Sequence, residues 1–257
     1  GGSTAGLPAC FRVVAAVEWD DGLARVYASN HAHPVLVHDI SDLPGLLKRL
    51  EPFAPVHFVQ LSTPCQDWSP MGKGVEGSRA EVTVWAARLL VALRPRAWLL
   101  ENAATLLARA RPGGAWRRAE AILVRGGFVL RSTLVEAGDL GVGQSRIRTW
   151  VVGVLGGSGA FCDAFVRGLD CFTALGPRPR GMVQRCTVAQ VAPGIGRFFF
   201  QYRRSRKSPM ILSTDRWAPA VVKNSGMVPG RYVARPNDAA PLRECTWPSV
   251  AVLAALQ

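Results

Sequence analysis

The stretch that decides the fold reads Val56-His57-Phe58-Val59-Gln60-Leu61-Ser62-Thr63-Pro64-Cys65-Gln66. Its first seven residues are mostly apolar and predict a buried strand over 56–62. Glycines at 72, 74 and 77 then indicate a loop. Cys65 therefore stands where a strand gives way to a loop, at the edge of a sheet and facing a cleft. Its thiolate would be a nucleophile there, whereas a structural cysteine would simply be buried.

Short apolar runs alternate with helix-like segments on both sides of this stretch. The strand-like runs are 12–18, 35–38, 56–62, 97–101, 128–136 and 149–154, and the helix-like segments are 21–29, 43–50, 80–93 and 115–125. This alternation predicts an α/β fold with a mostly parallel sheet covered by helices on both faces. Ligands of such sheets bind beyond the carboxyl ends of the strands, where Glu18, Asp39, Cys65 and Glu101 fall.

The character of the sequence changes after Leu155. Gly156-Gly157-Ser158-Gly159 indicates a turn or linker, and residues 160–235 are irregular and basic. We expect a first domain over 1–155, a smaller irregular lobe over 156–238, and a return to the first domain over 239–257. A short helix is predicted over 248–256.

The composition is that of a globular chain with one sizeable core, since 49% of the 257 residues are hydrophobic. No uncharged apolar stretch reaches the 18 residues typical of a membrane helix, and residues 1–7 lack the features of a secretory signal. The six cysteines form no CxxC pair and no zinc spacing. We expect a reduced intracellular compartment, which is the nucleus in a eukaryote or the cytoplasm in a bacterium.

The charge balance favours a polyanionic partner. Lys and Arg total 31 against 18 acidic residues, a net charge of +13, and each phosphate that a cation neutralises releases counterions. The excess is mostly arginine, whose forked guanidinium suits phosphate or guanine. A basic surface that only reflects a GC-rich coding background is the alternative.

The acids at the predicted strand ends are candidate binding groups. Glu18 follows the first strand, and an acid there typically holds the ribose hydroxyls of a nucleotide-like cofactor. Asp39 follows the second strand and could meet an adenine. Either acid could instead cap the next helix. Glu101 ends the strand beside Cys65, and a carboxyl group that burial keeps protonated can donate a proton; a solvated strand end is its alternative.

A cationic motif precedes the last predicted strand of the first domain. In Gln144-Ser145-Arg146-Ile147-Arg148, strand alternation places Gln144, Arg146 and Arg148 on one face. These groups could grip a base edge and a phosphate. An exposed edge strand, which commonly carries charge, is the alternative.

Taken in order, these segments resemble the cytosine-C5 DNA methyltransferases. Pro64-Cys65-Gln66 is similar to the nucleophile motif of that family, Glu101-Asn102 to its Glu-Asn motif, and Gln144-x-Arg146-x-Arg148 to its Gln-x-Arg-x-Arg strand. Glu18-Trp19 and Asp39-Ile40 resemble its cofactor contacts, and Gly1-Gly2 the tail of its glycine-rich loop. The resemblance covers residues 1–155, and the lobe that follows stands where the family has its target-recognition domain.

The resemblance implies a Rossmann-like fold that uses S-adenosylmethionine and no metal, and a monomer acting on double-stranded DNA. Cys65, Glu101 and Arg146 would be catalytic. Cofactor contacts would come from Gly1, Gly2, Glu18, Trp19, Asp39, Ile40 and Pro64, and substrate contacts from Gln66, Asn102, Gln144 and Arg148.

The implied reaction begins with attack of the Cys65 thiolate on C6 of a cytosine, which makes C5 nucleophilic. Glu101 would stabilise the adduct at N3 and Arg146 at O2, C5 would take the methyl group, and loss of the C5 proton would expel Cys65. The target base must first be flipped out of the duplex.

The ends of the chain depart from the family pattern. The chain starts inside the cofactor loop, so the strand that the family places between those ending at Glu18 and Ser62 is absent. Residues 253–257 resemble the start of a Leu-Gln-Gly-Phe-Pro segment, and Val252 stands where the family often has Glu. We therefore expect these 257 residues to bind the cofactor poorly.

Two other interpretations remain open. Cys171-Phe172-Thr173 is similar to a motif of the branch that methylates tRNA, without its accompanying tyrosines. A non-catalytic or decayed DNA-binding relative would fit the missing ends, while the intact Cys65, Glu101 and Arg146 oppose it.

Overall fold

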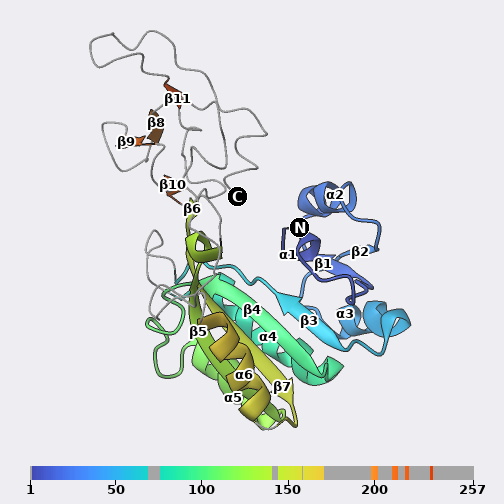
Figure 1. Ribbon diagram of the computed structural model, residues 1–257. Coiled ribbons are helices and arrows are strands. Elements are labelled where there is room, and N and C mark those ends of the chain that lie inside the picture. The colour runs from blue at the N-terminus through green and yellow to red at the C-terminus, as the bar shows by residue number, and fades with distance from the viewer. Residues whose placement is uncertain are drawn as a thin grey trace, which may run out of the picture. The chain divides into compact units, whose positions relative to one another are not determined.

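The computed structural model describes residues 2–68, 76–140, 144–157 and 159–170, and short strands at 198–201, 210–213, 218–219 and 232–233 (Figure 1). Several predictions lie outside these residues. They are Gly1, the loop glycines Gly72 and Gly74, the Cys171-Phe172-Thr173 motif, most of the lobe over 156–238, and all of 239–257 with its predicted helix and Val252.

The N-terminal part forms a small parallel sheet with helices. Its elements are α1 (Gly2–Ala5), β1 (Ala16–Glu18), α2 (Asp21–Ala28), β2 (Val35–Val37), α3 (Leu43–Leu50) and the 3-10 helix η1 (Glu51–Phe53). β1 pairs with β2 in parallel, with Glu18 opposite Val37. Asp20 caps α2 by accepting from the Leu23 N–H, and Asp42 caps α3 at Gly45. Glu18 and Asp39 are thus not the capping residues.

The main sheet has the order β3-β4-β7-β5, made of β3 (Phe58–Leu61), β4 (Ala97–Ala103), β7 (Ile147–Leu155) and β5 (Phe128–Glu136). β3 and β4 are parallel. The Leu155 N–H donates to the Arg96 carbonyl and the Gly156 N–H to the Gly127 carbonyl, so the end of β7 lies at the start of both neighbours. β7 is therefore antiparallel, and the sheet is mixed rather than mostly parallel.

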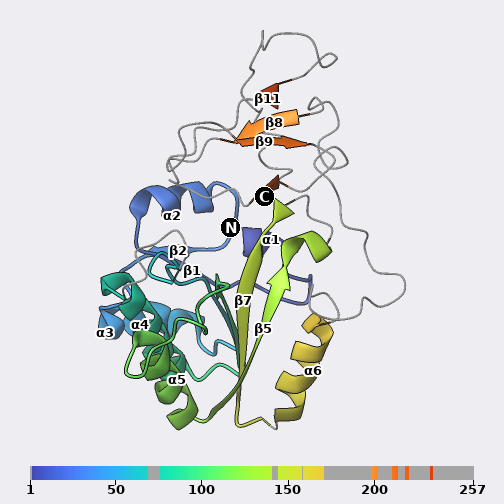
Figure 2. The same ribbon diagram turned by 90° about the vertical axis from the view of Figure 1, so that its left-hand side faces the viewer.

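Helices cover both faces of this sheet, as predicted. α4 (Ser78–Leu93) and α5 (Ala115–Arg125) pack on one face and α6 (Gly159–Asp170) on the other (Figure 2). α6 corrects the prediction that the chain is irregular from residue 160. Gly156 makes the turn, with φ of 60°, and Cys162 is buried against the sheet and donates to the Val129 carbonyl. The glycine-rich composition concealed where this helix begins.

The strands of the first domain form two sheets, where one had been expected. Among the described strands, β1 and β2 pair with each other and not with the four-stranded sheet. Side chains join the two sheets. Leu46 and Leu50 of α3 are buried with Leu89 of α4 in one apolar cluster. The ring of Phe11, before β1, meets that of Phe58 in β3 edge to face, with centroids 5.1 Å apart.

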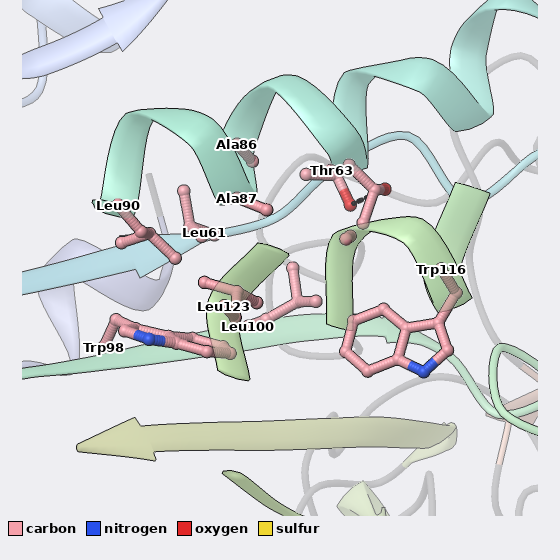
Figure 3. Close-up of a pocket in the computed structure, with 11 residues that line it drawn as sticks. Leu61, Thr63, Ala86, Ala87, Leu90, Trp98, Leu100, Trp116 and Leu123 are labelled. Atoms are coloured by element: carbon pink, nitrogen blue, oxygen red, sulfur yellow. Dashed lines mark hydrogen bonds between the residues drawn. The ribbon is translucent and has the colours of Figure 1, made fainter. Parts of the chain in front are cut away.

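The core between the main sheet and α4 and α5 is tightly filled. Figure 3 shows Ala86, Ala87 and Leu90 of α4 directed toward Trp98 and Leu100 of β4. The void among them measures about 10 Å³, room for at most one water molecule. It is a packing defect rather than a ligand site.

The described chain divides into two compact units. The first contains Gly1–Ser132 and Thr149–Val166, and the second Thr133–Arg148 and Arg167–Gln257. The second includes η2 (Ala137–Leu140), β6 (Gln144–Ser145), β8 (Phe198–Gln201), β9 (Met210–Ser213), β10 (Ala218–Pro219) and β11 (Tyr232–Val233). β8 pairs with β9 and β11 in antiparallel fashion, and β10 pairs with β6 in parallel. Among the described residues, no helix is long and apolar enough to cross a membrane.

Gly153 of β7 leaves room for the Trp98 side chain of β4. A Cβ atom there would lie 2.2 Å from Cε2 of the fully buried Trp98. We therefore predict that Gly153→Ala lowers the free energy of unfolding by about 1–3 kcal/mol through overpacking, as measured by urea denaturation. Gly77→Ala is the control, since its Cβ would have ordinary contact at 3.7 Å. Equal stability of the two variants would contradict the packing described.

Candidate active site

Cys65 lies four residues beyond the end of β3, at the carboxyl end of the parallel pair β3–β4. Leu61 is paired with Leu100, so the segment after β3 runs beside Glu101. Cys65 is half-buried and packs against the main core. Its carbonyl accepts from the N–H of Trp68, whose side chain is fully buried. The chain on both sides of Cys65 is therefore fixed while the thiol keeps partial access to solvent.

Glu101 shares this edge with Cys65. The Ser62 hydroxyl donates to Glu101 Oε2 at 3.0 Å, which joins the ends of the two strands through side chains. Glu101 is half-buried. The Ser62 hydrogen bond thus ties Glu101 to the segment that leads to Cys65.

Asn102 holds the end of β3 against β4. It is 1% exposed, and its Nδ2 donates to the Thr63 carbonyl at 3.1 Å and to Thr63 Oγ1 at 3.0 Å. Thr83 of α4 donates to the same hydroxyl at 3.1 Å. Because a buried amide with unmet hydrogen bonds is costly, this network fixes the backbone two residues before Cys65. The geometry favours a positioning role for Asn102 over the substrate contact expected for it.

Two acids that the sequence analysis missed bind helix N-termini near Cys65. Asp67 Oδ2 accepts from the N–H groups of Gly77 and Ala80 at 2.9 and 3.0 Å, at the start of α4. Glu76 Oε2 accepts from the Ala115 N–H at 2.6 Å, at the start of α5. The N-cap residue is Gly77 in α4 and Gly114 in α5, and neither glycine has a side chain that could cap its helix.

A carboxylate at a helix N-terminus satisfies open N–H groups and meets the positive end of the helix dipole. The segment that follows Cys65 is therefore tied to both helices. Sequence patterns for capping look within three residues of the helix start, so a cap from a distant residue leaves no local signal.

Glu18 and Asp39 lie at one edge of the β1–β2 sheet. Glu18 Oε1 accepts from the N–H groups of Trp19 and Asp20, at 2.9 and 3.1 Å, which orients the carboxylate at the end of β1. Asp39 is exposed, and the hydrogen bond from the Ser41 N–H lowers the pKa of its carboxyl group. Trp19 is 73% exposed, an unusual position for so large an apolar ring.

The remaining site residues of the first unit vary in burial. Ile40 and Pro64 are half-buried, Ile40 against the α3 cluster, whereas Gln66 is exposed. Gly2 begins α1. No three His, Cys, Asp or Glu side chains are grouped to hold a metal ion within the described part of the chain.

The Gln-x-Arg-x-Arg motif belongs to the second unit. Gln144 lies in β6, and β7 begins at Ile147, two residues earlier than predicted. The buried Glu136 accepts from the N–H groups of Arg146 and Gly138 at 2.7 and 3.1 Å, and the Arg146 carbonyl accepts from the Ala137 N–H. Glu136, which the sequence analysis did not select, therefore fixes the backbone at Arg146.

Burial distinguishes Cys65 from another described cysteine. Desolvation raises the pKa of the fully buried Cys162 thiol, which keeps it protonated and inert. Cys65 is instead half-buried at the strand end, beside a carboxyl group. Of these two cysteines, Cys65 is the one that is partly exposed.

Known proteins resemble the chain across this site. The model of the C-5 cytosine-specific DNA methylase family matches residues 1–164. The type II methyltransferase M.HgiDI of Herpetosiphon aurantiacus is 28% identical over 247 residues, which cover 93% of this chain and 74% of that protein. M.HindV of Haemophilus influenzae, also a type II methyltransferase, is 26% identical over 56% of this chain and 46% of its own length.

Two solved structures share the fold. A DNA modification methyltransferase encoded within an E. coli prophage has a TM-score of 0.54 at 21% identity, over 77% of this chain and 56% of that one. The S. pombe Dnmt2 methyltransferase has a TM-score of 0.51 at 16% identity, over 70% and 51%. The chain therefore spans about half the length of these two solved chains.

We predict that Asp67→Ala destabilises the protein by about 1 kcal/mol, because two N–H groups of α4 lose their acceptor. Urea denaturation measures the loss, and amide hydrogen exchange at Ala80 should accelerate. Glu120→Ala is the matched control, since Glu120 lies inside α5 and pairs with the exposed Arg117, and its loss should change stability little. Unchanged amide exchange at Ala80 in the Asp67 variant would contradict the hydrogen bonds between Asp67 and the start of α4.

Proposed function

The chain belongs to the C-5 cytosine-specific DNA methylase family, and from this premise we propose that it methylates C5 of cytosine in double-stranded DNA through a covalent bond between Cys65 and C6. One observation carries the proposal. Cys65 and Glu101 occupy the carboxyl ends of adjacent parallel strands, with Ser62 hydrogen-bonded to Glu101 at 3.0 Å. A thiol and a carboxyl group at the same edge of the sheet are the pair that addition to a cytosine ring requires.

Cys65 acts as the nucleophile. Cytosine C5 is a poor nucleophile, and attack of the thiolate on C6 forms a C6–S bond and shifts the ring electrons toward C5 and N3. Glu101 provides a proton to N3 and so neutralises the charge that develops there. The Asn102–Thr63 network keeps the backbone before Cys65 in place during attack.

The reaction ends by elimination. Once C5 carries a methyl group, a base removes the C5 proton, the electrons re-form the C5–C6 double bond, and the C6–S bond breaks to release the Cys65 thiolate. N3 returns its proton to Glu101. Both side chains thus end as they began, as a catalytic cycle requires.

S-adenosylmethionine supplies the methyl group in this proposal. The edge where β1 and β2 end fits such a molecule, because a fixed carboxylate at Glu18 suits ribose hydroxyls and the exposed Trp19 ring suits an adenine face. Asp39, Ile40, Pro64, Gly1 and Gly2 are the further contacts we propose.

The target base must leave the duplex to reach Cys65. We assign contacts with DNA to Gln66, which is exposed, and to Gln144 and Arg148 of the second unit. Arg146, whose backbone Glu136 fixes, is assigned to the cytosine O2. These roles follow the order of the motifs in the chain, and each remains a proposal.

Trapping on DNA that contains 5-fluorocytosine tests the function. Fluorine at C5 cannot leave as a proton does, so elimination fails after methylation and the protein stays attached. With S-adenosylmethionine in large excess, to offset the weak cofactor binding expected from the sequence, we expect a protein–DNA adduct that survives denaturation and is lost in Cys65→Ala. Cys162→Ala serves as the matched cysteine control and should still form the adduct.

Other outcomes have distinct meanings. An adduct with structured RNA but none with DNA would replace the proposed substrate. DNA binding without an adduct on either nucleic acid would replace the proposed enzyme with a binding protein.

A further inference from the structure

An open groove with a volume of about 370 Å³ runs between α4 and α5 on the outer surface of the first unit. Its floor includes Val84 and Ala121, and four arginines line it: Arg88, Arg117, Arg118 and Arg125. All four arginines are exposed. The reaction proposed above makes no use of this surface.

The two helices lie side by side and run in the same direction (Figure 1). Glu81 of α4 is paired with Arg118 of α5 near their N-termini. Near their C-termini, a Cβ atom on Gly126 would lie 2.5 Å from Cγ2 of Val91. The helices therefore lie side by side from their N-terminal to their C-terminal turns.

Each helix carries an arginine seven residues beyond its member of this pair. Arg88 follows Glu81 and Arg125 follows Arg118 at the same spacing, close to two helical turns or about 10 Å along the axis. One end of the groove therefore carries an opposite-charge pair, and the other carries two like charges on facing helices.

The acids that pair with arginines of the groove engage Arg118 and Arg117 rather than Arg88 or Arg125. Glu81 binds Arg118, and Glu120 binds Arg117 at 2.8 Å. Arg88 lies over the ring of Trp85, with Cζ 4.5 Å from the ring centroid, a contact that orients the guanidinium without neutralising it. An anion that enters between Arg88 and Arg125 would relieve their mutual repulsion.

We propose that Arg88 and Arg125 bind a phosphate group of the backbone of double-stranded DNA. Guanidinium groups make forked, charge-assisted bonds to phosphate oxygens, and the overall charge of +13 favours a polyanion. The choice of DNA over an acidic protein rests on the proposed function. Arg88 lies ten residues beyond Ser78, about 15 Å along α4 from the end that Asp67 caps. The proposed phosphate contact is therefore separate from the contact with the flipped base.

Binding of a 25-base-pair duplex of A·T pairs only tests the proposal, because no cytosine is present to engage Cys65. The measurement is fluorescence anisotropy of the full chain at several salt concentrations. In the double variant Arg88→Gln/Arg125→Gln, we expect weaker binding and a slope of log K against log salt that is shallower by about 1.8, or about 0.9 for each positive charge removed from the phosphates. Arg12→Gln/Arg25→Gln removes the same charge from exposed positions outside the groove and should leave the slope nearly unchanged.

Three results would overturn the proposal. They are an unchanged slope in the groove variant, an equal decrease in the control, or weaker binding of the groove variant to poly-glutamate while its DNA binding is intact. Arg88→Lys/Arg125→Lys should largely retain the slope, since it keeps both charges. In the unmodified chain, the duplex should protect Arg88 and Arg125 from phenylglyoxal, mapped by mass spectrometry, which requires no variant to fold.

Failure of this proposal and failure of the proposed function are distinguishable. The groove variant should still form the Cys65 adduct on saturating 5-fluorocytosine DNA, because the groove touches neither the nucleophile nor the base. If the salt slope is unchanged in the groove variant while trapping is intact, the proposed phosphate contact is wrong and the proposed function stands.

Discussion

The parallel pairing of β3 with β4 is the constraint on which the site depends. It places the residues after Leu61 beside Glu101, and the buried Asn102 amide fixes Thr63 from the neighbouring strand. A buried amide satisfied in this way tolerates little displacement, because each broken hydrogen bond leaves a desolvated polar group. Backbone pairing thus fixes where the chain leaves β3 beside Glu101, and the Asn102–Thr63 hydrogen bonds fix the start of the segment that leads to Cys65.

The N-termini of α4 and α5 fix the chain on both sides of the segment that follows Cys65. Asp67 and Glu76 lie on either side of residues 69–75 and bind the N-termini of α4 and α5. The same two helices pack on the main sheet and carry the arginine groove along their outer surface. Their starts therefore support the proposed chemistry, and their later turns offer a separate basic surface.

The strong local signals in the sequence predicted most of the first domain. The helices at 43–50 and 115–125 and the strand at 128–136 match the structure, because the pattern of apolar residues is clear there. The mixed sheet escaped prediction because the direction of β7 depends on which neighbours it joins. α6 was missed behind four glycine-rich residues, and Asp67, Glu76 and Glu136 were missed because they act on residues distant in sequence. The placement of Cys65 and Glu101 after and within two neighbouring parallel strands was predictable from the strand pattern; the Asn102–Thr63 network was not.

The central claim is that Cys65 and Glu101 act on one cytosine because paired strands hold them together. Exchange of the C5 hydrogen of cytosine, followed as tritium release from DNA labelled at C5, tests this directly, since exchange requires addition at C6 and proton transfer. We expect release by the unmodified chain, none by Cys65→Ala, and release slower by roughly 10²- to 10⁴-fold in Glu101→Gln, the usual contribution of a positioned acid. Unchanged release from the Glu101 variant, or persistent release without Cys65, would contradict it.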